Sequence, residues 1–164
     1  MQGVQLLKLM GARVLVTSRQ DERLDFARSQ GADAAVNTGR QDLLRAVLDF
    51  SDGEGVDCVF DTTGLSTSIQ QSLELVRPGG KVAVVGYQDP TFVVKYEPLV
   101  IKEKEIVGCR SSTIQDVVEL VRLAGEGRIK PVVTRQFPLA QVNEGLAQLS
   151  AGSIIGRAVL LPQG

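Results

Sequence analysis

The amino-acid sequence predicts an α/β fold in which helices cover both faces of a parallel β-sheet. Short apolar runs rich in β-branched residues alternate along the chain with longer segments in which apolar residues recur every three or four positions. No linker, repeat or low-complexity stretch interrupts this alternation. Because a parallel pair of strands needs a long crossover between its members, strands separated by helices indicate parallel pairing.

The first half of the chain is expected to contain three helices and three strands. Residues 21–30 carry the clearest helical signals, since Asp21 and Glu22 lie in the first turn and Gly31 follows the end. Apolar runs mark the strands, and the first and third of these are expected to be buried. The predicted helices are 3–10, 21–30 and 41–50, and the predicted strands are 13–17, 34–36 and 56–61.

The second half continues the same alternation. A Pro-Gly-Gly turn at 78–80 separates a helix from the next strand. Thr113 with Asp116 three residues later resembles a capping box at the start of another helix. The predicted helices are 66–76 and 113–124, and Val142, Leu146 and Leu149 form an apolar stripe that indicates a further helix. The predicted strands are 81–85, 105–107 and 158–161.

Length and charge exclude several classes of partner. With 164 residues, 43% of them hydrophobic, the chain is long enough to bury a core without disulfide or metal support. Lys and Arg number 18 against 19 Asp and Glu, so there is no basic field to bind a nucleic acid backbone. No apolar run approaches the roughly 20 residues of a membrane span. Neither nucleic acid nor membrane is therefore expected as a partner.

The absence of histidine restricts the chemistry further. It excludes Ser-His-Asp and Cys-His catalysis and any zinc site that needs imidazole. The two cysteines, Cys58 and Cys109, lie in apolar stretches and are expected to be packing residues rather than metal ligands. Two cysteines without a signal peptide favour a reducing compartment, so a cytoplasmic location is expected.

The loops after the predicted strands contain glycine and small, hydroxyl-bearing residues. Because the carboxyl ends of parallel strands meet at one edge of the sheet, we expect these loops to form a ligand-binding rim. The alternative is that they are ordinary turn residues. Asp61 is the acid–base candidate on this rim, although an aspartate that closes a strand more often caps a turn. The loops are 17–19, 62–64, 86–87 and 109–112.

Five segments, in order and at matching intervals, resemble the cofactor-binding half of the medium-chain (zinc-type) alcohol dehydrogenase superfamily. They are GVQLLKLMGARVLVTSRQDERLDFARSQGAD, GVDCVFDTTG, VRPGGKVAVVG, KEKEIVGCRSST and SIIGRAVLLP. The resemblance covers Met1 to Pro162 and implies a Rossmann-like, doubly wound parallel sheet that binds a nicotinamide dinucleotide. It also implies that residues 1–132 are a dinucleotide-binding domain and that residues 133–164 return to pack on a catalytic domain.

In that family, the first strand, the glycine-rich fingerprint and the zinc-bearing catalytic domain would precede the position of Met1. The chain is therefore expected to be truncated, with an incomplete Rossmann domain. Because the first strand is central in the usual order, the remaining strands are expected to form two sub-sheets. Direct pairing of these sub-sheets, association with a second chain and marginal stability are the alternative consequences. An exposed C-terminal segment favours self-association or contact with the missing domain.

The resemblance also implies which residues contact the cofactor. Ser18 and Arg19 stand where an acidic residue would bind the ribose of NAD, and they suit a 2′-phosphate, so NADP is expected, with NAD as the alternative. Arg23 resembles a basic residue that lies near the ribose in that family. The alternative is that Arg19 and Arg23 belong to a solvated helix start, where Asp21 and Glu22 could pair with them. The other matching positions are Thr62, Thr63 and Gly64 on the ribose side, Val85, Gly86, Cys109 and Ser111 at the nicotinamide carboxamide, and Arg157 near the pyrophosphate.

The sequence therefore predicts the NADP(H)-binding portion of an alcohol dehydrogenase-like oxidoreductase, which transfers hydride between nicotinamide and an alcohol or carbonyl substrate. No residue is predicted to be catalytic, no zinc site is expected, and the chain alone is expected to be inactive. Two alternatives remain. One is a non-catalytic fragment or interaction module, and the other is an S-adenosylmethionine-dependent methyltransferase, which the segment 76–81 before an apolar strand would also suit.

Overall fold

The computed structural model describes residues 2–162, which divide into two compact units. The terminal unit consists of the described parts of Met1–Gly39 and Ile114–Gly164, and the central unit is Arg40–Thr113. Each unit has its own sheets and its own buried apolar residues. The division expected near residue 132 concerns packing on another domain and stays a prediction.

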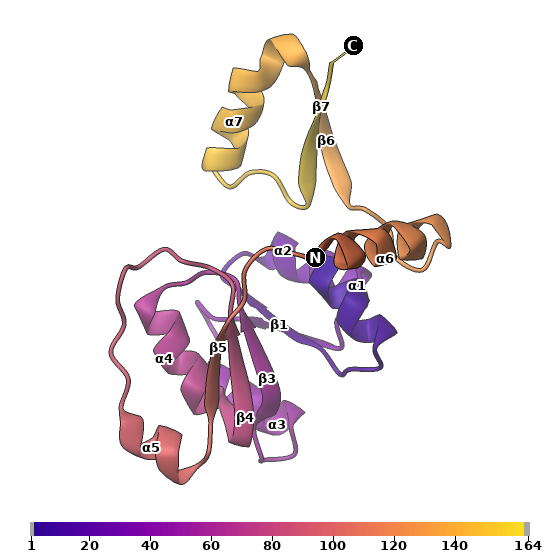
Figure 1. Ribbon diagram of the computed structural model, residues 1–164. Coiled ribbons are helices and arrows are strands. Elements are labelled where there is room, and N and C mark those ends of the chain that lie inside the picture. Colours follow the sequence, from indigo (N-terminus) through magenta and orange to yellow (C-terminus); the bar gives the residue numbers. More distant parts are fainter. Residues whose placement is uncertain (1, 163–164) are drawn as a thin grey trace. The chain divides into compact units, whose positions relative to one another are not determined.

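Helices and strands alternate along most of the chain in both units (Figure 1). The terminal unit contains α1 (Gln2–Leu9), β1 (Leu15–Ser18), α2 (Asp21–Ser29), β2 (Ala34–Asn37), α6 (Ile114–Gly125), β6 (Val133–Pro138), the 3-10 turn η1 (Leu139–Gln141), α7 (Val142–Ser150) and β7 (Arg157–Leu161). The central unit contains α3 (Leu43–Phe50), β3 (Val56–Asp61), α4 (Ser66–Leu75), β4 (Val76–Val84), α5 (Tyr96–Ile101) and β5 (Glu105–Gly108).

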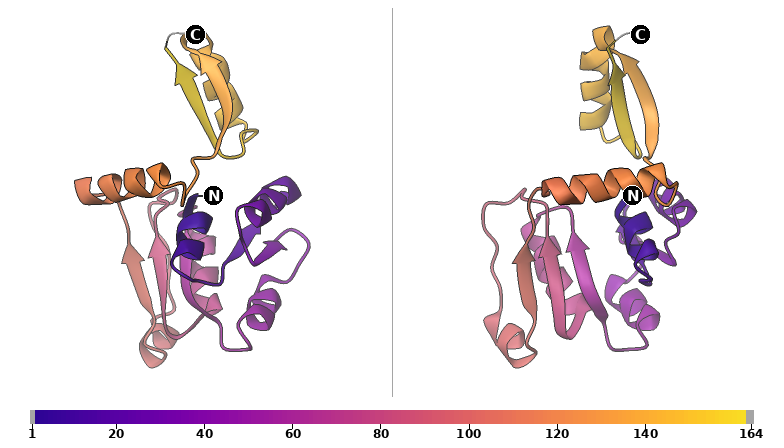
Figure 2. Two further views of the ribbon diagram at one scale, coloured as in Figure 1. Left: turned by 90° about the vertical axis from the view of Figure 1, so that its right-hand side faces the viewer. Right: turned by 45° about the vertical axis from the view of Figure 1, so that its right-hand side comes forward.

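The terminal unit has two separate two-stranded parallel sheets, β1–β2 and β6–β7. Leu24 and Ala27 form the buried side of α2, which packs against both strands of the first sheet. Helix α7 packs beside β6 and β7 (Figure 2), and a Cβ atom at Gly145 would lie 3.2 Å from the ring of the buried Phe137. Each helix thus covers a short parallel pair, as the alternation of strand and helix predicts.

Polar contacts join distant segments of the terminal unit. The carboxylate of Asp33 accepts hydrogen bonds from Nζ of Lys8 at 2.8 Å and from the N–H of Val14 at 2.6 Å. These two bonds, with that from Lys8 the larger cause, lower the pKa of Asp33 below its ordinary value. The side chain of Gln5 exchanges two hydrogen bonds with the backbone of Lys130, at 2.7 and 3.1 Å. Helix α1 is therefore fixed both to the start of β1 and to the segment after α6.

The central unit is built on the parallel sheet β3–β4–β5. Val82 of the middle strand β4 has no exposed surface, and Ile69 and Leu75 of α4 are buried. Helix α4 packs against β3 and β4 and also contacts α3. The core of this unit therefore lies between α4 and the middle of the sheet, and the carboxyl ends of all three strands lie at the same edge.

The predicted α/β class and most element positions are confirmed, but β4 and its neighbours differ from the prediction. Strand β4 begins at Val76, five residues before the predicted start. The register of its pairing with β3 shifts from Val56↔Val76 to Cys58↔Lys81, so the Pro-Gly-Gly segment is an irregularity inside the ladder rather than a turn before it. Helix α5 and strand β6 were not predicted from the sequence pattern.

The expectation that Cys58 and Cys109 are packed in apolar surroundings is wrong. Both thiols are exposed. Strand β3 was also expected to be buried, yet the Phe60 side chain is 56% exposed. The exposed Cys58 and Phe60 alternate along β3 with the less exposed Val59 and Asp61, so one face of this strand is not covered within the described residues. Cys109 lies beyond the end of β5, where the ladder has stopped.

The strands of 2–162 form separate sheets, which confirms the prediction that β1–β2 and the central strands would make two sub-sheets. Direct pairing of the two sub-sheets stays a prediction. Association with a second chain and marginal stability remain predictions. None of the helices within the described residues has the length and apolar character that a membrane crossing requires.

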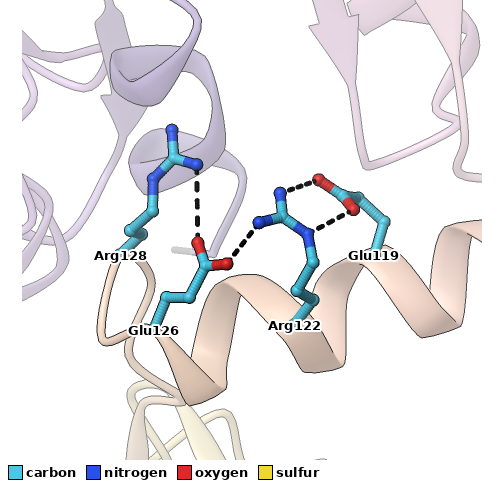
Figure 3. Close-up of polar contacts among 4 residues, drawn as sticks. All are labelled: Glu119, Arg122, Glu126 and Arg128. Atoms are coloured by element: carbon cyan, nitrogen blue, oxygen red, sulfur yellow. Dashed lines mark hydrogen bonds and ion pairs between the residues drawn. The ribbon is translucent and has the colours of Figure 1, made fainter.

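Helix α6 carries charge pairs along its exposed surface. Leu123 is its buried residue, whereas Ile114 is 79% exposed. Arg122 pairs with Glu119 at 2.6 Å and with Glu126, which also approaches Arg128 (Figure 3). Hydrogen bonds from Arg122 to Glu119 and then to Glu126 raise the pKa of this arginine above its ordinary value. Pairs three and four residues apart support a helix that packing alone would hold weakly.

Candidate functional site

Asp61 closes β3 and organises the loop that follows it. Its Oδ1 atom accepts hydrogen bonds from the N–H groups of Thr63 and Gly64, both at 2.8 Å, and from the Thr63 hydroxyl at 3.0 Å. Its Oδ2 atom accepts from the hydroxyl of Ser68 in α4. Burial alone would raise the pKa of Asp61, but these hydrogen bonds, that from Ser68 first, outweigh burial and hold the pKa below its ordinary value. Asp61 is therefore a turn-capping residue.

The loops after β3 and β4 meet backbone to backbone. A Cβ atom at Gly64, where φ is +68°, would lie 2.2 Å from the carbonyl carbon of Gly86. A Cβ atom at Gly86 would in turn lie 2.3 Å from the carbonyl carbon of Thr63. The N–H groups of Val85 and Gly86 both point to the carbonyl oxygen of Asp61, at 2.8 and 3.3 Å. We call residues 62–64 and 85–86 together the glycine ledge.

The chain beyond the glycine ledge is fastened to helix α4. The N–H of Asp89 donates to the carbonyl of Gly64 at 3.0 Å. The Asp89 carboxylate accepts from the N–H of Ser66, at 2.7 Å, and so caps the first turn of α4. Further along the helix, the side-chain amide of Gln70 donates to the carbonyl of Val93 at 2.7 Å. The glycine ledge is therefore fixed by hydrogen bonds to Asp61, which precedes it in the sequence, and to Asp89, which follows it.

Several backbone N–H groups of these loops are already engaged within the protein, whereas two of their carbonyl oxygens are not. The N–H of Cys109 donates to the carbonyl of Val84 at 2.9 Å, and Ser111 has a φ of +59° where the loop turns away from β5. The carbonyl oxygens of Val85 and Gly86 accept no hydrogen bond from the described residues. Such an edge suits a ligand group that donates, for example a primary amide. The N–H groups already engaged are those of Thr63, Gly64, Val85, Gly86 and Cys109.

In the terminal unit, the end of β1 carries Ser18 and Arg19. The Ser18 hydroxyl accepts the N–H of Gln20 at 3.1 Å, which leaves its own proton to donate. The Arg19 side chain is exposed and its guanidinium forms no ion pair with the described residues. The neighbouring carboxylate of Asp21 instead accepts a hydrogen bond from Asn37 at 2.7 Å. The alternative in which Asp21 neutralises Arg19 therefore does not hold.

Of the other two predicted arginines, the side chain of Arg23 is hydrogen-bonded within the protein, whereas that of Arg157 is exposed. The guanidinium of Arg23 donates from Nε to the Gln20 side chain at 2.6 Å and from Nη2 to the carbonyl of Gly152 at 2.7 Å. Arg157 is the exposed first residue of β7, and its N–H donates to the carbonyl of Val132 at 2.8 Å. Arg23 thus joins the start of α2 to the turn after α7. The Nη1 atom of Arg23 makes no hydrogen bond within the described residues.

The structure brings together the predicted residues of the central unit, since Thr62, Thr63 and Gly64 touch Val85 and Gly86 in the ledge. The sequence reasoning missed Asn37 and Asp89. Asn37 begins an Asn-Thr-Gly sequence and Asp89 precedes a proline, so both carry turn signals. Those signals indicate a turn, but they do not reveal the distant backbone groups that the two side chains bind. The predicted residues Ser18, Arg19, Arg23 and Arg157 belong to the terminal unit.

The described residues do not fit a zinc ion. They contain no group of three or more His, Cys, Asp or Glu side chains placed to hold a metal. The donor set explains this, because the chain has no histidine and its two cysteines are single exposed thiols. No chemical step in this chain is therefore assigned to zinc.

Comparison with known proteins agrees with the fold and with the resemblance. The family model described as zinc-binding dehydrogenase matches residues 1–126. A D-arabitol-phosphate dehydrogenase of Enterococcus avium is 31% identical over 157 residues, which are 93% of this chain and 45% of that protein. An NAD-dependent alcohol dehydrogenase of Saccharolobus solfataricus is 28% identical over 160 residues, 97% of this chain and 46% of that protein. The chain thus spans about half the length of these relatives.

Solved structures show the same fold. The alcohol dehydrogenase from the archaeon Aeropyrum pernix superposes with a TM-score of 0.88 at 30% identity, over 97% of this chain and 46% of that one. The α/β architecture with parallel sheets is therefore that of the Rossmann-like part of alcohol dehydrogenases. Because the family model matches more than half of this chain, the chain belongs to the zinc-binding dehydrogenase family.

Proposed function

We propose that this chain binds a nicotinamide dinucleotide, NADP(H) in preference to NAD(H), as the cofactor-binding part of an alcohol dehydrogenase-like oxidoreductase. The observation that carries the proposal is the glycine ledge at the carboxyl edge of β3–β4–β5, where two loops pack backbone to backbone and two carbonyl oxygens accept no hydrogen bond from the described residues. Ligands of open parallel sheets bind outside this edge. Family membership supports a nucleotide cofactor of this class.

The ledge supports binding of the nicotinamide end. A carboxamide has an NH₂ group that needs acceptors, and the carbonyl oxygens of Val85 and Gly86 are the acceptors that this edge leaves available. The hydroxyl of the exposed Thr62 suits the ribose, and Gly64 lets the backbone approach it closely. Thr63 is proposed to line the same side, although its hydroxyl already donates to Asp61. The loop of Cys109 and Ser111 completes this group of proposed contacts.

The terminal unit supports the choice of NADP(H). Arg19 offers a guanidinium that has no ion-pair partner among residues 2–162, and Ser18 offers a hydroxyl proton, so both suit a 2′-phosphate. Arg23 is proposed to contact the ribose through Nη1, because its other nitrogens are occupied. Arg157 is proposed to approach the pyrophosphate as a point of positive charge. NAD(H) is the alternative cofactor.

The residues of this chain would bind and orient the cofactor, and the nicotinamide supplies the hydride chemistry when bound. Holding the carboxamide in one orientation fixes which face of the ring meets the substrate. Asp61 is not available for proton transfer, since both of its carboxylate oxygens accept hydrogen bonds within the protein. We therefore expect no turnover from this chain by itself.

Fluorescence titration of the chain with NADPH, NADH and S-adenosylmethionine tests the proposal. Binding of NADPH at least tenfold tighter than NADH is expected, with no binding of S-adenosylmethionine. Equal binding of NADPH and NADH would leave the dinucleotide site standing and remove the preference for NADP. Binding of S-adenosylmethionine alone would favour the methyltransferase alternative. If none of the three binds, the chain is better explained as a non-catalytic module.

A further inference from the structure

Helix α4 begins with a hydrogen bond that comes from a distant part of the chain. The residue before its first turn is Leu65, whose side chain makes no capping hydrogen bond. The N–H of Ser66 is bound instead by the carboxylate of Asp89, at 2.7 Å and 23 residues further along the chain. A carboxylate at this end of a helix is favourable both as an acceptor and as a negative charge near the positive end of the helix dipole. Asp89 therefore supplies the cap that the local sequence lacks.

Asp89 is tied to the glycine ledge by its backbone as well as by its side chain. Its N–H donates to the carbonyl of Gly64 at 3.0 Å, and the N–H of Gln88 approaches the same oxygen at 3.3 Å. Its carboxylate binds Ser66, two residues after Gly64. These contacts close the chain that leaves β4 onto the chain that enters α4.

The two carbonyl groups that the glycine ledge leaves available differ in what holds them. A peptide unit is planar, so the carbonyl of one residue turns together with the N–H of the next. The carbonyl of Val85 shares its plane with the N–H of Gly86, which donates to the carbonyl of Asp61 at 3.3 Å. The carbonyl of Gly86 shares its plane with the N–H of Tyr87, which donates no hydrogen bond to the described residues. Asp61 therefore fixes the first carbonyl but not the second.

Packing limits the Gly86 carbonyl on one side only. The peptide unit between Gly86 and Tyr87 lies against Gly64, where a Cβ atom would approach the Tyr87 nitrogen to 2.3 Å. That contact blocks movement toward Gly64, but it does not oppose movement away from it, which the conformational freedom of a glycine permits. The next anchor along the chain is the set of hydrogen bonds made by residues 88–89. The orientation of the Gly86 carbonyl therefore depends on Asp89.

We infer that Asp89 is a positioning residue for the nicotinamide carboxamide. It touches no ligand itself and acts through the Gly86 carbonyl, which it holds in place to accept a hydrogen bond from the carboxamide NH₂ group. The inference rests on the proposed function, because it requires that the glycine ledge binds the nicotinamide end of a dinucleotide. It adds that the backbone of the ledge is insufficient for this contact unless a side chain beyond it fastens the loop to α4.

The test compares the dissociation constants of NADPH and of its 3-acetylpyridine analogue, in which a methyl ketone replaces the carboxamide and the NH₂ donor is lost. Their ratio isolates the carboxamide contact, because changes in charge or folding act on both ligands alike. The unchanged chain is expected to bind NADPH about tenfold tighter than the analogue. Asp89→Ala is expected to weaken NADPH about fivefold and the analogue by less than about twofold. Asp89→Asn should restore the ratio, since its amide oxygen still accepts the N–H of Ser66.

Two further variants separate this effect from a general loss of stability. Ser66→Pro removes the N–H that Asp89 binds, and proline is well tolerated at the first position of a helix, so it should lower the ratio as Asp89→Ala does. Asp42→Ala is the matched control, because the Asp42 carboxylate caps α3 in the same unit by accepting the N–H of Arg45 at 3.0 Å. It removes a helix cap of the same kind and is expected to leave both dissociation constants within about twofold.

The outcomes separate this inference from the function on which it rests. If the unchanged chain binds NADPH but either Asp89→Ala or Ser66→Pro weakens NADPH and the analogue equally, the bond between these residues does not position the carboxamide contact, and the inference is overturned while the proposed function stands. The same follows if the unchanged chain binds NADPH and the analogue equally, since the carboxamide donor then makes no contact. If it binds neither, the proposed function and the inference fail together. Should Asp89→Ala not fold, Ser66→Pro is judged by the same ratio.

Discussion

The glycine ledge and the edge after β1 both follow parallel strands, yet they are fixed by different means. The ledge is held by contacts that leave no space for a Cβ atom at Gly64 or Gly86 and by hydrogen bonds to Asp61. The edge after β1 instead depends on exposed or half-buried side chains, above all Arg19. Backbone packing of the first kind tolerates little change, whereas the charge of the second is easily altered. Orientation of a ligand and selection between ligands are therefore separable in this chain.

The largest expected effect is that of Gly64→Ala. The new Cβ would overlap the Gly86 backbone at 2.2 Å, and φ of +68° is unfavourable for alanine, so the two loops must separate. We expect a loss of at least about 3 kcal/mol in the free energy of unfolding. Urea denaturation followed by circular dichroism measures it. Gly108→Ala is the matched control, since a Cβ there meets nothing within 4 Å. A loss below about 1 kcal/mol for Gly64→Ala would show that the two loops can separate at little cost in stability.

The next effect is that of Asp61→Asn, which keeps the shape of the ledge support but changes its hydrogen bonding. The amide retains an acceptor for the N–H groups of Thr63 and Gly64, but it sets an NH₂ group where the carboxylate accepts from Ser68. We expect a loss of about 2 kcal/mol in the free energy of unfolding at neutral pH. An unchanged denaturation midpoint would show that the carboxylate contributes nothing to the ledge.

The effect of Asp61→Asn on the free energy of unfolding is also expected to depend on pH. The pKa of Asp61 in the folded chain lies below 3.8, the ordinary value that applies after unfolding. Its contribution to stability is therefore present above pH 3.8 and is lost as the pH falls through the folded pKa. Denaturation series between pH 7 and pH 2 should show the difference between the unchanged chain and Asp61→Asn shrinking as the pH falls below about 4. A constant difference would contradict a lowered pKa.

The sequence predicted those parts of the fold that depend on local signals. Helix α2 matches its prediction closely because its acidic first turn and the glycine after it act within a few residues. The start of β4 was missed because Pro78 and the glycines after it indicate a turn, whereas here the ladder continues past an irregularity. The exposure of Cys58 was missed for a related reason. An apolar run predicts a strand, but whether each face of that strand is covered depends on how distant segments pack on the sheet.

The candidate site shows the same limit. The residues of the ledge were predicted because glycine and hydroxyl residues after strands are a local pattern. That their N–H groups are already engaged was not predictable, since it depends on how the Asp61 carboxylate and carbonyl meet the neighbouring loop. Asn37 was missed because its importance arises from contacts with residues 16 and 18 positions away.

For the edge after β1, we expect Arg19→Ala to weaken NADPH binding about tenfold while NADH changes by less than about twofold. The guanidinium is exposed, so its contribution is reduced by solvent relative to a buried charge-assisted hydrogen bond. Unfolding should be unaffected, which is the opposite of the result expected for Gly64→Ala. Arg45→Ala is the control for loss of one positive charge, because Arg45 pairs with Asp49 on α3 and was not predicted to touch the cofactor. Equal weakening of NADPH by both variants would reduce the role of Arg19 to net charge.

Arg23→Lys is expected to have the smallest effect, and it tests whether fold and selectivity separate within one side chain. The guanidinium joins Gln20 to the carbonyl of Gly152 from two nitrogens, a geometry that a single ammonium group reproduces poorly. We expect a loss of about 1 kcal/mol in the free energy of unfolding. NADPH and NADH should weaken alike and by less than about threefold, because the proposed contact is to the ribose that both share. A selective loss of NADPH binding would instead place Arg23 beside the 2′-phosphate together with Arg19. Structural and selective roles would then meet in one side chain at this edge, in contrast to the ledge, where backbone groups orient the ligand and no side chain is proposed to select between the two cofactors.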